Sequence, residues 1–122
     1  MVKNQKEGKM LGDVRKNEKF FQLAIISQDE LENGKIVLMV NDDNGQLNNR
    51  IVMDWREFQK EFYSHPKTEG YYLRQVMVEE ISGNQIFYVR LDAKDRPCSS
   101  TRIVQKEIFL KTYLFPDQAG LI

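Results

Sequence analysis

The segment from Arg50 to Tyr63, RIVMDWREFQKEFY, constrains the fold of this chain more than any other part of the sequence. Asp54 can accept backbone N–H groups at the start of a helix, and Glu57 follows three residues later, as in a capping box. The aromatic residues at helical spacing are Trp55, Phe58 and Phe62. The pattern predicts a short amphipathic helix with its aromatic side on a sheet. We expect it to stop at His65-Pro66, because the residue before proline avoids the α region.

A similar segment, RIVQKEIFLKTYLF, runs from Arg102 to Phe115. The tripeptide Arg-Ile-Val is identical in both, and apolar positions follow it in both. In this alignment Phe58, Phe62 and Tyr63 correspond to Leu110, Leu114 and Phe115, Phe20-Phe21 to Tyr71-Tyr72, and residues 35–41 to residues 85–91. The similarity predicts two tandem repeats, residues 19–65 and 70–115, each of several strands ending in a helix. Chance similarity between strand-rich segments is the alternative.

The dipeptide Asn44-Gly45 is the strongest hairpin signal, because a type I′ turn needs positive φ at both central residues. With this dipeptide in the turn, Asp43 lies opposite Gln46 and the register of the flanking strands follows. One face then carries Ile36, Leu38, Val40, Leu47, Ile51 and Met53, which we expect in the core. The other carries Lys35, Val37, Met39, Asn41, Asn48, Arg50 and Val52. We expect that half-apolar face to be either a binding surface or the seam between the repeats.

The expected fold class is α+β, a mostly antiparallel sheet with one or two short helices. Further strands are predicted from β-prone runs at residues 20–26, 71–81, 85–91 and 98–104. The polar runs 27–34, 82–84 and 92–97 are expected to be loops or turns, and residues 108–115 suit a helix or a strand equally. We expect one domain at residues 19–115, a mobile arm at residues 1–18 and a tail at residues 116–122.

The balance of charges argues against a protein that binds nucleic-acid phosphates non-specifically. The chain of 122 residues has 18 basic and 18 acidic side chains, whereas non-specific binding to phosphates favours a basic protein. The single cysteine, Cys98, excludes a disulfide within the chain and favours a reducing compartment. No apolar run approaches the length of a membrane span, and the N-terminus lacks the hydrophobic core of a signal peptide. We therefore expect a cytoplasmic protein with no membrane partner.

The sequence lacks the usual parts of a catalytic site. His65 is the single histidine and is expected at the surface, which leaves no histidine pair for a metal. Cys98 is expected to be a half-buried thiol on a strand rather than a nucleophile. The run Asp42-Asp43-Asn44-Gly45 lacks the first and last ligands of a calcium loop, and no glycine-rich phosphate loop occurs. We therefore expect no enzymatic activity, no metal site and no cofactor.

Aromatic and basic residues are interleaved on the predicted strands, as on surfaces that bind single-stranded DNA or RNA. On such surfaces the rings stack on bases while the cations contact phosphates. The candidate nucleic-acid-binding residues are Lys19, Phe20, Tyr72, Arg74, Tyr88 and Arg90. The alternative is that the rings belong to the core and the cations are ordinary outward-facing residues.

The order of these motifs resembles a PUR repeat. It begins with Lys-Phe-Phe at 19–21, passes through Ile-Val-Leu-Met-Val at 36–40 and a glycine-containing turn, and ends with Arg-Ile-Val-Met-x-Trp-x-x-Phe at 50–58. The resemblance covers about residues 19–115, and the strand-rich Whirly fold fits nearly as well. It implies two intertwined repeats, each of a four-stranded sheet and a helix, that bind single-stranded nucleic acid. The neutral charge balance and the ambiguous last segment depart from this pattern.

A small protein-interaction module is the competing hypothesis, for instance an inhibitor or adaptor encoded by a phage or mobile element. It would dock through the Val37, Met39 and Val52 face or through an edge strand, and a homodimer is a further expectation. Surface chemistry separates the two hypotheses. A continuous positive face with exposed rings favours nucleic acid, whereas a mixed surface with a bare apolar patch favours a protein partner.

Overall fold

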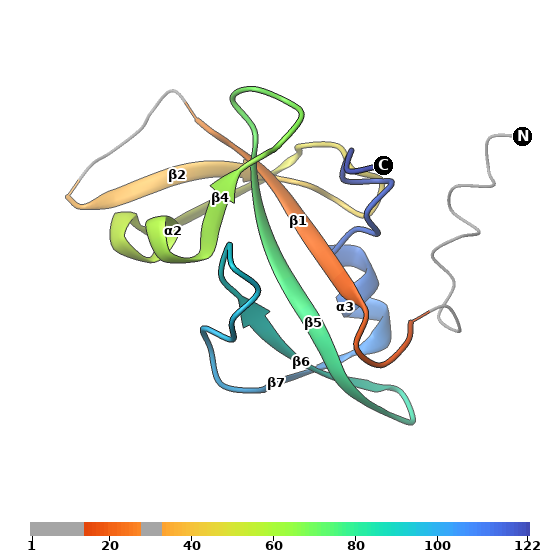
Figure 1. The fold of residues 1–122 in the computed structure, drawn as a ribbon. Coiled ribbons are helices and arrows are strands. Elements are labelled where there is room, and N and C mark those ends of the chain that lie inside the picture. The colour runs from red at the N-terminus through yellow and green to blue at the C-terminus, as the bar shows by residue number, and fades with distance from the viewer. Residues whose placement is uncertain (1–13, 28–32) are drawn as a thin grey trace, which may run out of the picture.

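The structure of this protein is a computed structural model that describes residues 14–27 and 33–122. Its strands form one antiparallel sheet in the order β3-β2-β1-β5-β6-β7, and the short β4 pairs with β5 (Figure 1). The strands are β1 (Lys19–Ile26), β2 (Lys35–Val40), β3 (Asn49–Asp54), β4 (Phe62–Ser64), β5 (Tyr72–Ser82), β6 (Gln85–Leu91) and β7 (Arg102–Gln105). The helices α2 (Trp55–Glu61) and α3 (Lys106–Thr112) follow β3 and β7. The predicted fold class is confirmed.

Each half of the chain runs through three strands, a helix and a short β segment, and that short segment pairs with the other half. β4 pairs with β5, where Tyr63 lies opposite Leu73. Leu114 follows α3 and forms a bridge with Phe21 of β1. At the centre of the sheet β1 lies beside β5, and Gln22 pairs with Arg74. Each half thus supplies a segment that extends the sheet of the other.

The two faces of the sheet are covered by different elements. On the face that we call the helix face, Phe58 of α2 packs with Ala24 and Leu38, while Phe109 of α3 packs with Phe20 and Val76. Figure 1 shows α2 beside β2 and β4, with α3 at the other end of the curled sheet. On the opposite face, the outer face, the central cluster consists of Phe21, Leu23, Leu73, Leu114 and Ala119. The C-terminal segment therefore covers the middle of the outer face. It does not cover the margins of that face, which are formed by β3 and β7.

The register predicted around Asn44-Gly45 is confirmed, although the turn is of another kind. Leu38 pairs with Ile51, and Lys35 pairs with Asp54. Asn44 does not have positive φ, whereas Gly45 has φ of 86°. Asp42 closes the turn instead, because its carboxylate accepts the N–H groups of Asn44 and Gln46, each within 3.0 Å. Leu47, expected with the core face of the hairpin, packs against the outer-face cluster because the chain leaves the ladder after Val40.

The helix after β3 begins as predicted but ends earlier. Asp54 is its N-cap residue without a side-chain cap bond, because the carboxylate binds Lys35 Nζ at 2.7 Å. The helix ends at Glu61, four residues before His65, and residues 62–64 form β4, which was not predicted. Residues 108–115, open between helix and strand, lie mostly in α3. Predicted strand 98–104 is shorter, since β7 begins at Arg102.

The identical Arg-Ile-Val tripeptides are not structural counterparts. Phe58 and Phe109 are buried at the same position of α2 and α3, and Phe62 and Tyr113 are the C-cap residues. The alignment that placed Leu110 and Leu114 opposite Phe58 and Phe62 was therefore wrong by one residue. The loops after β2 and β6 do correspond: Asp92 accepts the N–H groups of Lys94 and Arg96 as Asp42 accepts those of Asn44 and Gln46. Asp95 also has positive φ, 63°, at the place of Gly45.

The boundaries of the domain are wider than predicted. Residues 1–13 of the expected arm, and 28–32 of the expected first loop, lie outside the described residues. Val14 is buried in the core cluster around Phe109, so the packed part begins before residue 19. Within the expected tail, Ala119 is buried and its carbonyl lies 2.7 Å from Nε2 of His65. His65 was expected at the surface but is buried by this segment.

In residues 14–27 and 33–122, no helix has the length and apolar character needed to span a membrane.

Candidate binding surfaces

Five of the six predicted nucleic-acid-binding residues lie together on the helix face. Their cross-strand pairs place them there: Phe20 with Val76, Tyr72 with Ala24, Arg74 with Gln22, Tyr88 with Val78, and Arg90 with Val76. Lys19 lies on the outer face and binds Asp95 at 2.9 Å. Phe20 is fully buried and Tyr88 is 8 % exposed, because α3 covers their end of the sheet. Their rings belong to the core and offer no face to a base.

The two arginines of the predicted set converge on one carboxylate. Arg74 Nη1 lies 2.7 Å and Arg90 Nη1 3.2 Å from Glu61 Oε1, at the end of α2. Gln22 accepts two further bonds from Arg74, whose guanidinium lies 4.7 Å from the centre of the Phe62 ring. Burial, and then Arg90, lower the pKa of Arg74, yet an arginine keeps its charge at neutral pH. The cluster therefore carries one excess positive charge. The donors of Arg74 point at Glu61 and Gln22, whereas Nε of Arg90 is buried and has no hydrogen-bond partner among the described residues.

Two other groups on this side titrate above their ordinary values. Burial, assisted by Tyr113, raises the pKa of Tyr88 to about 12. Burial and the nearby carboxylates of Glu61 and Asp92 raise the pKa of the half-buried Cys98 thiol. A raised pKa leaves less thiolate at neutral pH, which is opposite to what a nucleophilic cysteine needs. Within the described residues no group of three or more His, Cys, Asp or Glu side chains could hold a metal ion.

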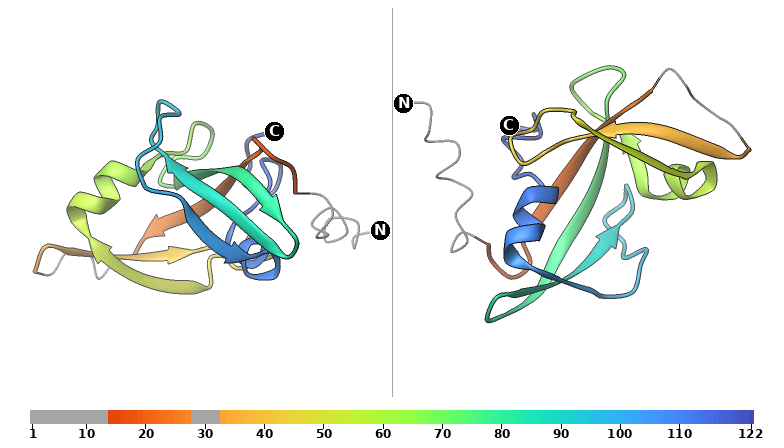
Figure 2. Two further views of the ribbon diagram at one scale, coloured as in Figure 1. Left: turned by 90° about the horizontal axis from the view of Figure 1, so that it is seen from below. Right: turned by 180° about the vertical axis from the view of Figure 1, so that it is seen from behind.

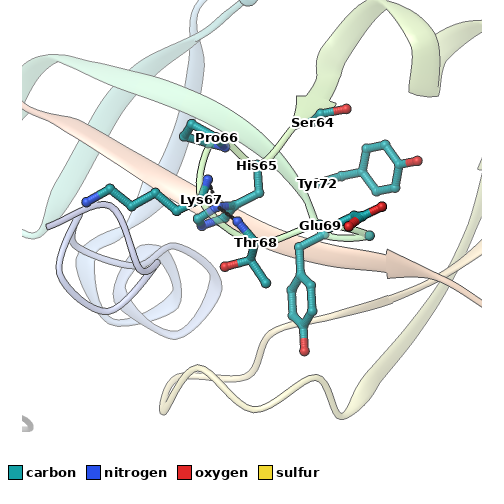
Figure 3. Close-up of a pocket in the computed structure, with 9 residues that line it drawn as sticks. Ser64, His65, Pro66, Lys67, Thr68, Glu69 and Tyr72 are labelled. Atoms are coloured by element: carbon teal, nitrogen blue, oxygen red, sulfur yellow. Dashed lines mark hydrogen bonds between the residues drawn. The ribbon is translucent and has the colours of Figure 1, made fainter.

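A surface pocket is formed by the loop between β4 and β5. Figure 3 shows its lining, which consists of Ser64, His65, Pro66, Lys67, Thr68, Glu69, Gly70, Tyr71 and Tyr72. Nδ1 of His65 accepts the backbone N–H groups of Lys67 and Thr68 at 3.0 and 3.1 Å. Nε2 must then carry the proton and donate to the carbonyl of Ala119. Both ring nitrogens are occupied, so this histidine ties the loop to the C-terminal segment and is not available as a base or metal ligand.

The outer face carries an apolar stripe beside each open edge of the sheet. The β3 stripe consists of the cross-strand pairs Ile25–Met39 and Val37–Val52. The β7 stripe consists of the cross-strand pairs Met77–Val89 and Phe87–Ile103. Each stripe ends in one exposed branched residue on the edge strand, Val52 at 51 % and Ile103 at 56 % exposure. Val52 precedes the N-cap of α2 by two residues, as Ile103 precedes the N-cap of α3.

On both edge strands the backbone groups at equivalent positions point out of the sheet, and no described residue pairs with them. The backbone N–H of Trp55 donates to the carbonyl of Gly34. In an antiparallel ladder, residues whose backbone N–H and C=O groups bind the neighbouring strand alternate with residues whose backbone groups point away from it. The N–H and C=O groups of Arg50, Val52 and Asp54 therefore point out of the sheet. Lys106 donates to Asn84 in the same way, so Ile103 and Gln105 point out of the other edge. In Figure 2, left, β3 lies along the outer margin of the sheet beside β2.

Charges on the outer face are mixed in sign. Lys35 pairs with Asp54, Lys19 with Asp95, and Lys16 with Glu80 at 3.7 Å. Arg50 makes no ion pair with any described residue. Val37 and Val89 of the two stripes are buried, and Val52 and Ile103 at the edges are exposed. Charges of both signs beside exposed apolar side chains favour a protein partner over nucleic acid. The sequence singled out Val37, Met39 and Val52, but not Ile103, because the registers of β6 and β7 were not predicted.

Comparison of this chain with protein-family models, with curated proteins and with solved structures finds no match.

Proposed function

We propose that this chain is a non-enzymatic protein-interaction module whose open sheet edges accept an extended segment of a partner protein. The observation that carries the proposal is the pair of edge strands, β3 and β7, each with outward backbone groups and one exposed branched residue. In strand addition, backbone hydrogen bonds provide affinity and side chains at alternate positions provide specificity. An edge that only had to avoid aggregation would carry charge or proline at its centre rather than Val52 or Ile103.

We further propose that the two edges have a common origin in an internal duplication. The same order of elements in both halves supports this, as do the matching loops closed by Asp42 and Asp92. A PUR-like or Whirly-like ancestry remains a proposal that rests on this order of elements. Under a duplication, a residue that binds a partner at one edge has a counterpart at the other, which is why Val52 and Ile103 are tested together.

Selection from a displayed library of random peptides on the immobilised full chain tests the proposal. We expect enrichment of extended sequences with apolar residues at alternate positions. Ile103→Pro and Val52→Pro each remove one outward N–H while leaving the intramolecular ladder intact, since a proline is tolerated where its nitrogen faces solvent. Binding of the selected peptides should therefore fall in at least one proline variant. The control is Glu69→Gln, an exposed change in the loop between β4 and β5, outside both edge strands.

Two results would contradict the proposal. One is the failure of any peptide family to enrich over the empty support. The other is enrichment of peptides whose affinity is the same for the wild-type chain, both proline variants and the control. Amide hydrogen exchange gives an independent readout, because peptide addition should protect the outward N–H groups of residues 101, 103 and 105, or of 50, 52 and 54.

Single-stranded nucleic-acid binding stays the second candidate, favoured by the excess positive charge at Arg74 and Arg90. Fluorescence anisotropy with a labelled oligonucleotide at low salt tests it, with Tyr72→Ala and Arg90→Ala as variants. Binding should weaken with salt by about 0.7 in the log–log slope for each phosphate contacted, and both variants should reduce it. Absence of binding at low salt would exclude this candidate and leave the edge-binding proposal untouched.

A further inference from the structure

We propose that the occupant of the β3 edge is a second copy of this chain, bound through antiparallel pairing of the two β3 strands. The inference rests on the proposed function in that it takes the open edges as binding sites. It goes further in naming the partner for one of them. The two copies would be related by a two-fold axis through Val52, which makes the interface isologous, with the same residues contributed by both sides.

The positions of the outward backbone groups of β3 permit this register, and it forms more backbone hydrogen bonds than the neighbouring registers do. Only Arg50, Val52 and Asp54 direct their N–H and C=O groups out of the edge. Outward residues must therefore pair with outward residues. If Val52 pairs with Val52 of the second copy, Arg50 falls opposite Asp54 and Asp54 opposite Arg50. All three outward residues then exchange their backbone bonds, whereas a shift by two residues in either direction leaves at least one of them unpaired.

The side chains fit the same register. On the outer face each Arg50 meets the Asp54 of the second copy, while the exposed Val52 side chains meet at the centre. Cross-strand pairs of opposite charge and of branched apolar residues both stabilise antiparallel pairing. Among the described residues Arg50 has no ion-pair partner, and the carboxylate of Asp54 binds Lys35 through Oδ1 alone. Its Oδ2 can therefore accept from Arg50 of the second copy. On the helix face the half-buried Ile51 and Met53 fall opposite each other.

The β7 edge lacks this self-complementarity. In the equivalent register Ile103 would meet Ile103, but Thr101 would meet Gln105, and no charges are matched. A β3–β7 pairing would place Arg50 opposite Gln105 and Asp54 opposite Thr101, which leaves both charges without a partner and would propagate from chain to chain as an open filament. The charge pattern therefore favours a closed dimer through β3. It leaves two β7 edges, one on each copy, for the peptide partner.

The interface is small, because β3 has six residues. Specific stable interfaces commonly bury about 1,200 Å² or more, which is more than a single short strand provides. We therefore expect a reversible dimer whose population rises with protein concentration. Sedimentation velocity of the full chain over a wide concentration range measures this directly. The wild-type chain should shift from monomer to dimer and should not continue to larger species.

The equivalent proline variants locate the interface. Val52→Pro removes one N–H donor from each copy and should raise the dimer dissociation constant by about tenfold or more. Ile103→Pro makes the same change at the same position of β7 and should leave the dissociation constant unchanged. Loss of the dimer in Ile103→Pro with retention in Val52→Pro would overturn the inference, as would a wild-type chain that stays monomeric at the highest concentration.

A charge exchange tests the register and does not depend on proline. Arg50→Asp places like charges opposite each other in a homodimer, as does Asp54→Arg, so each variant alone should dimerise more weakly than wild type. An equal mixture of the two variants restores both opposite-charge pairs and should form a heterodimer. A mixture that sediments as the separate variants do would overturn the register. Circular dichroism of each variant verifies that the fold is intact.

The two proposals fail in different ways. If the chain is monomeric but selected peptides still lose affinity in an edge proline variant, the second-copy inference is wrong and the proposed function stands. If the chain dimerises as described and no peptide binds either edge, the self-pairing stands and the wider interaction function fails.

Discussion

At the scale of single residues, the centre of the helix face depends on Glu61. Its carboxylate compensates Arg74 and Arg90, and the side chains of Glu61 and Arg74 are only 11 % and 9 % exposed. Glu61→Gln leaves the buried Arg74 and the half-buried Arg90 without an anion, and we expect it to lower the free energy of unfolding by about 3 to 5 kcal/mol. Urea denaturation measures the change. Glu80→Gln, which removes an exposed partner of Lys16, is the matched control and should change little, so equal effects would contradict this account.

The raised pKa of Tyr88 predicts how the free energy of unfolding changes at alkaline pH. Its pKa is raised from 10.0 to about 12, first by burial and then by Tyr113. The folded chain therefore holds this proton more tightly than the unfolded chain does. The stabilisation is complete below about pH 10 and is lost as the pH rises through about 12. We expect the free energy of unfolding to decline over this range, and to decline less steeply in Tyr88→Phe. Identical slopes in wild type and variant would show that Tyr88 is not responsible.

At the scale of elements, the C-terminal segment is part of the fold. Truncation after Phe115 removes the buried Ala119, whose carbonyl accepts the Nε2 proton of His65. An unsatisfied buried donor costs about 1 to 3 kcal/mol, and we expect at least that loss in the free energy of unfolding, with faster amide exchange in β4. Removal of Ile122 alone is the control, because this residue is 87 % exposed. The account fails if both truncations behave alike.

The loop closed by Asp42 depends on the backbone of one residue. Gly45 has φ of 86°, and a methyl group there would meet the carbonyl oxygen of Gln118 at 3.7 Å, an ordinary van der Waals contact. Gly45→Ala should therefore cost about 1 to 2 kcal/mol through backbone conformation alone. Asn44→Ala is the control, because Asn44 contributes to the turn through its backbone N–H rather than its side chain. Thermal unfolding of both variants distinguishes a backbone effect from a general sensitivity of this loop.

The sequence predicted individual helices and strands better than the contacts between them. The register of β2 and β3 was correct although the turn was not of type I′, because the connection is still centred on Asn44-Gly45 and this centre places Leu38 opposite Ile51. β4 was missed because its three residues form a strand only in pairing with β5. The placement of Arg74 and Arg90 on the helix face was likewise unpredictable, since the compensating Glu61 comes from another element.

Of the two candidate binding edges, the sequence predicted the one at β3 and not the one at β7. Val37, Met39 and Val52 were identified because the hairpin register was predictable from a short local signal. Ile103 was not, because the Ser82-Gly83-Asn84 turn allowed two registers and β5 has a bulge between Val78 and Glu80. The sequence does not show that Phe20 and Tyr88 belong to the core rather than to a nucleic-acid-binding surface, because the packing of α3 against that face of the sheet buries them.

At the scale of the whole molecule, the two halves are joined by exchange of their short segments. β4 extends β5, and Leu114 extends β1, while β1 and β5 pair along the centre. Each half separately would expose its side of this central pair, together with the apolar residues of the outer-face cluster, including Leu23 and Leu73. We infer that neither half is stable alone and that the domain unfolds in a single cooperative transition.

A chain divided in the loop between β4 and β5 tests this coupling. Residues 66–70 are exposed, so fragments 1–69 and 70–122 lose no buried contact at the cut itself. We expect each fragment alone to lack a cooperative unfolding transition, because its central strand and its short segment have no partners. Mixed together, the fragments should co-elute on gel filtration and regain the strand signal and near-ultraviolet spectrum of the intact chain. A cooperative transition in either isolated fragment would show that the halves are independent domains, and would remove the structural reason for treating β3 and β7 as the two margins of one sheet.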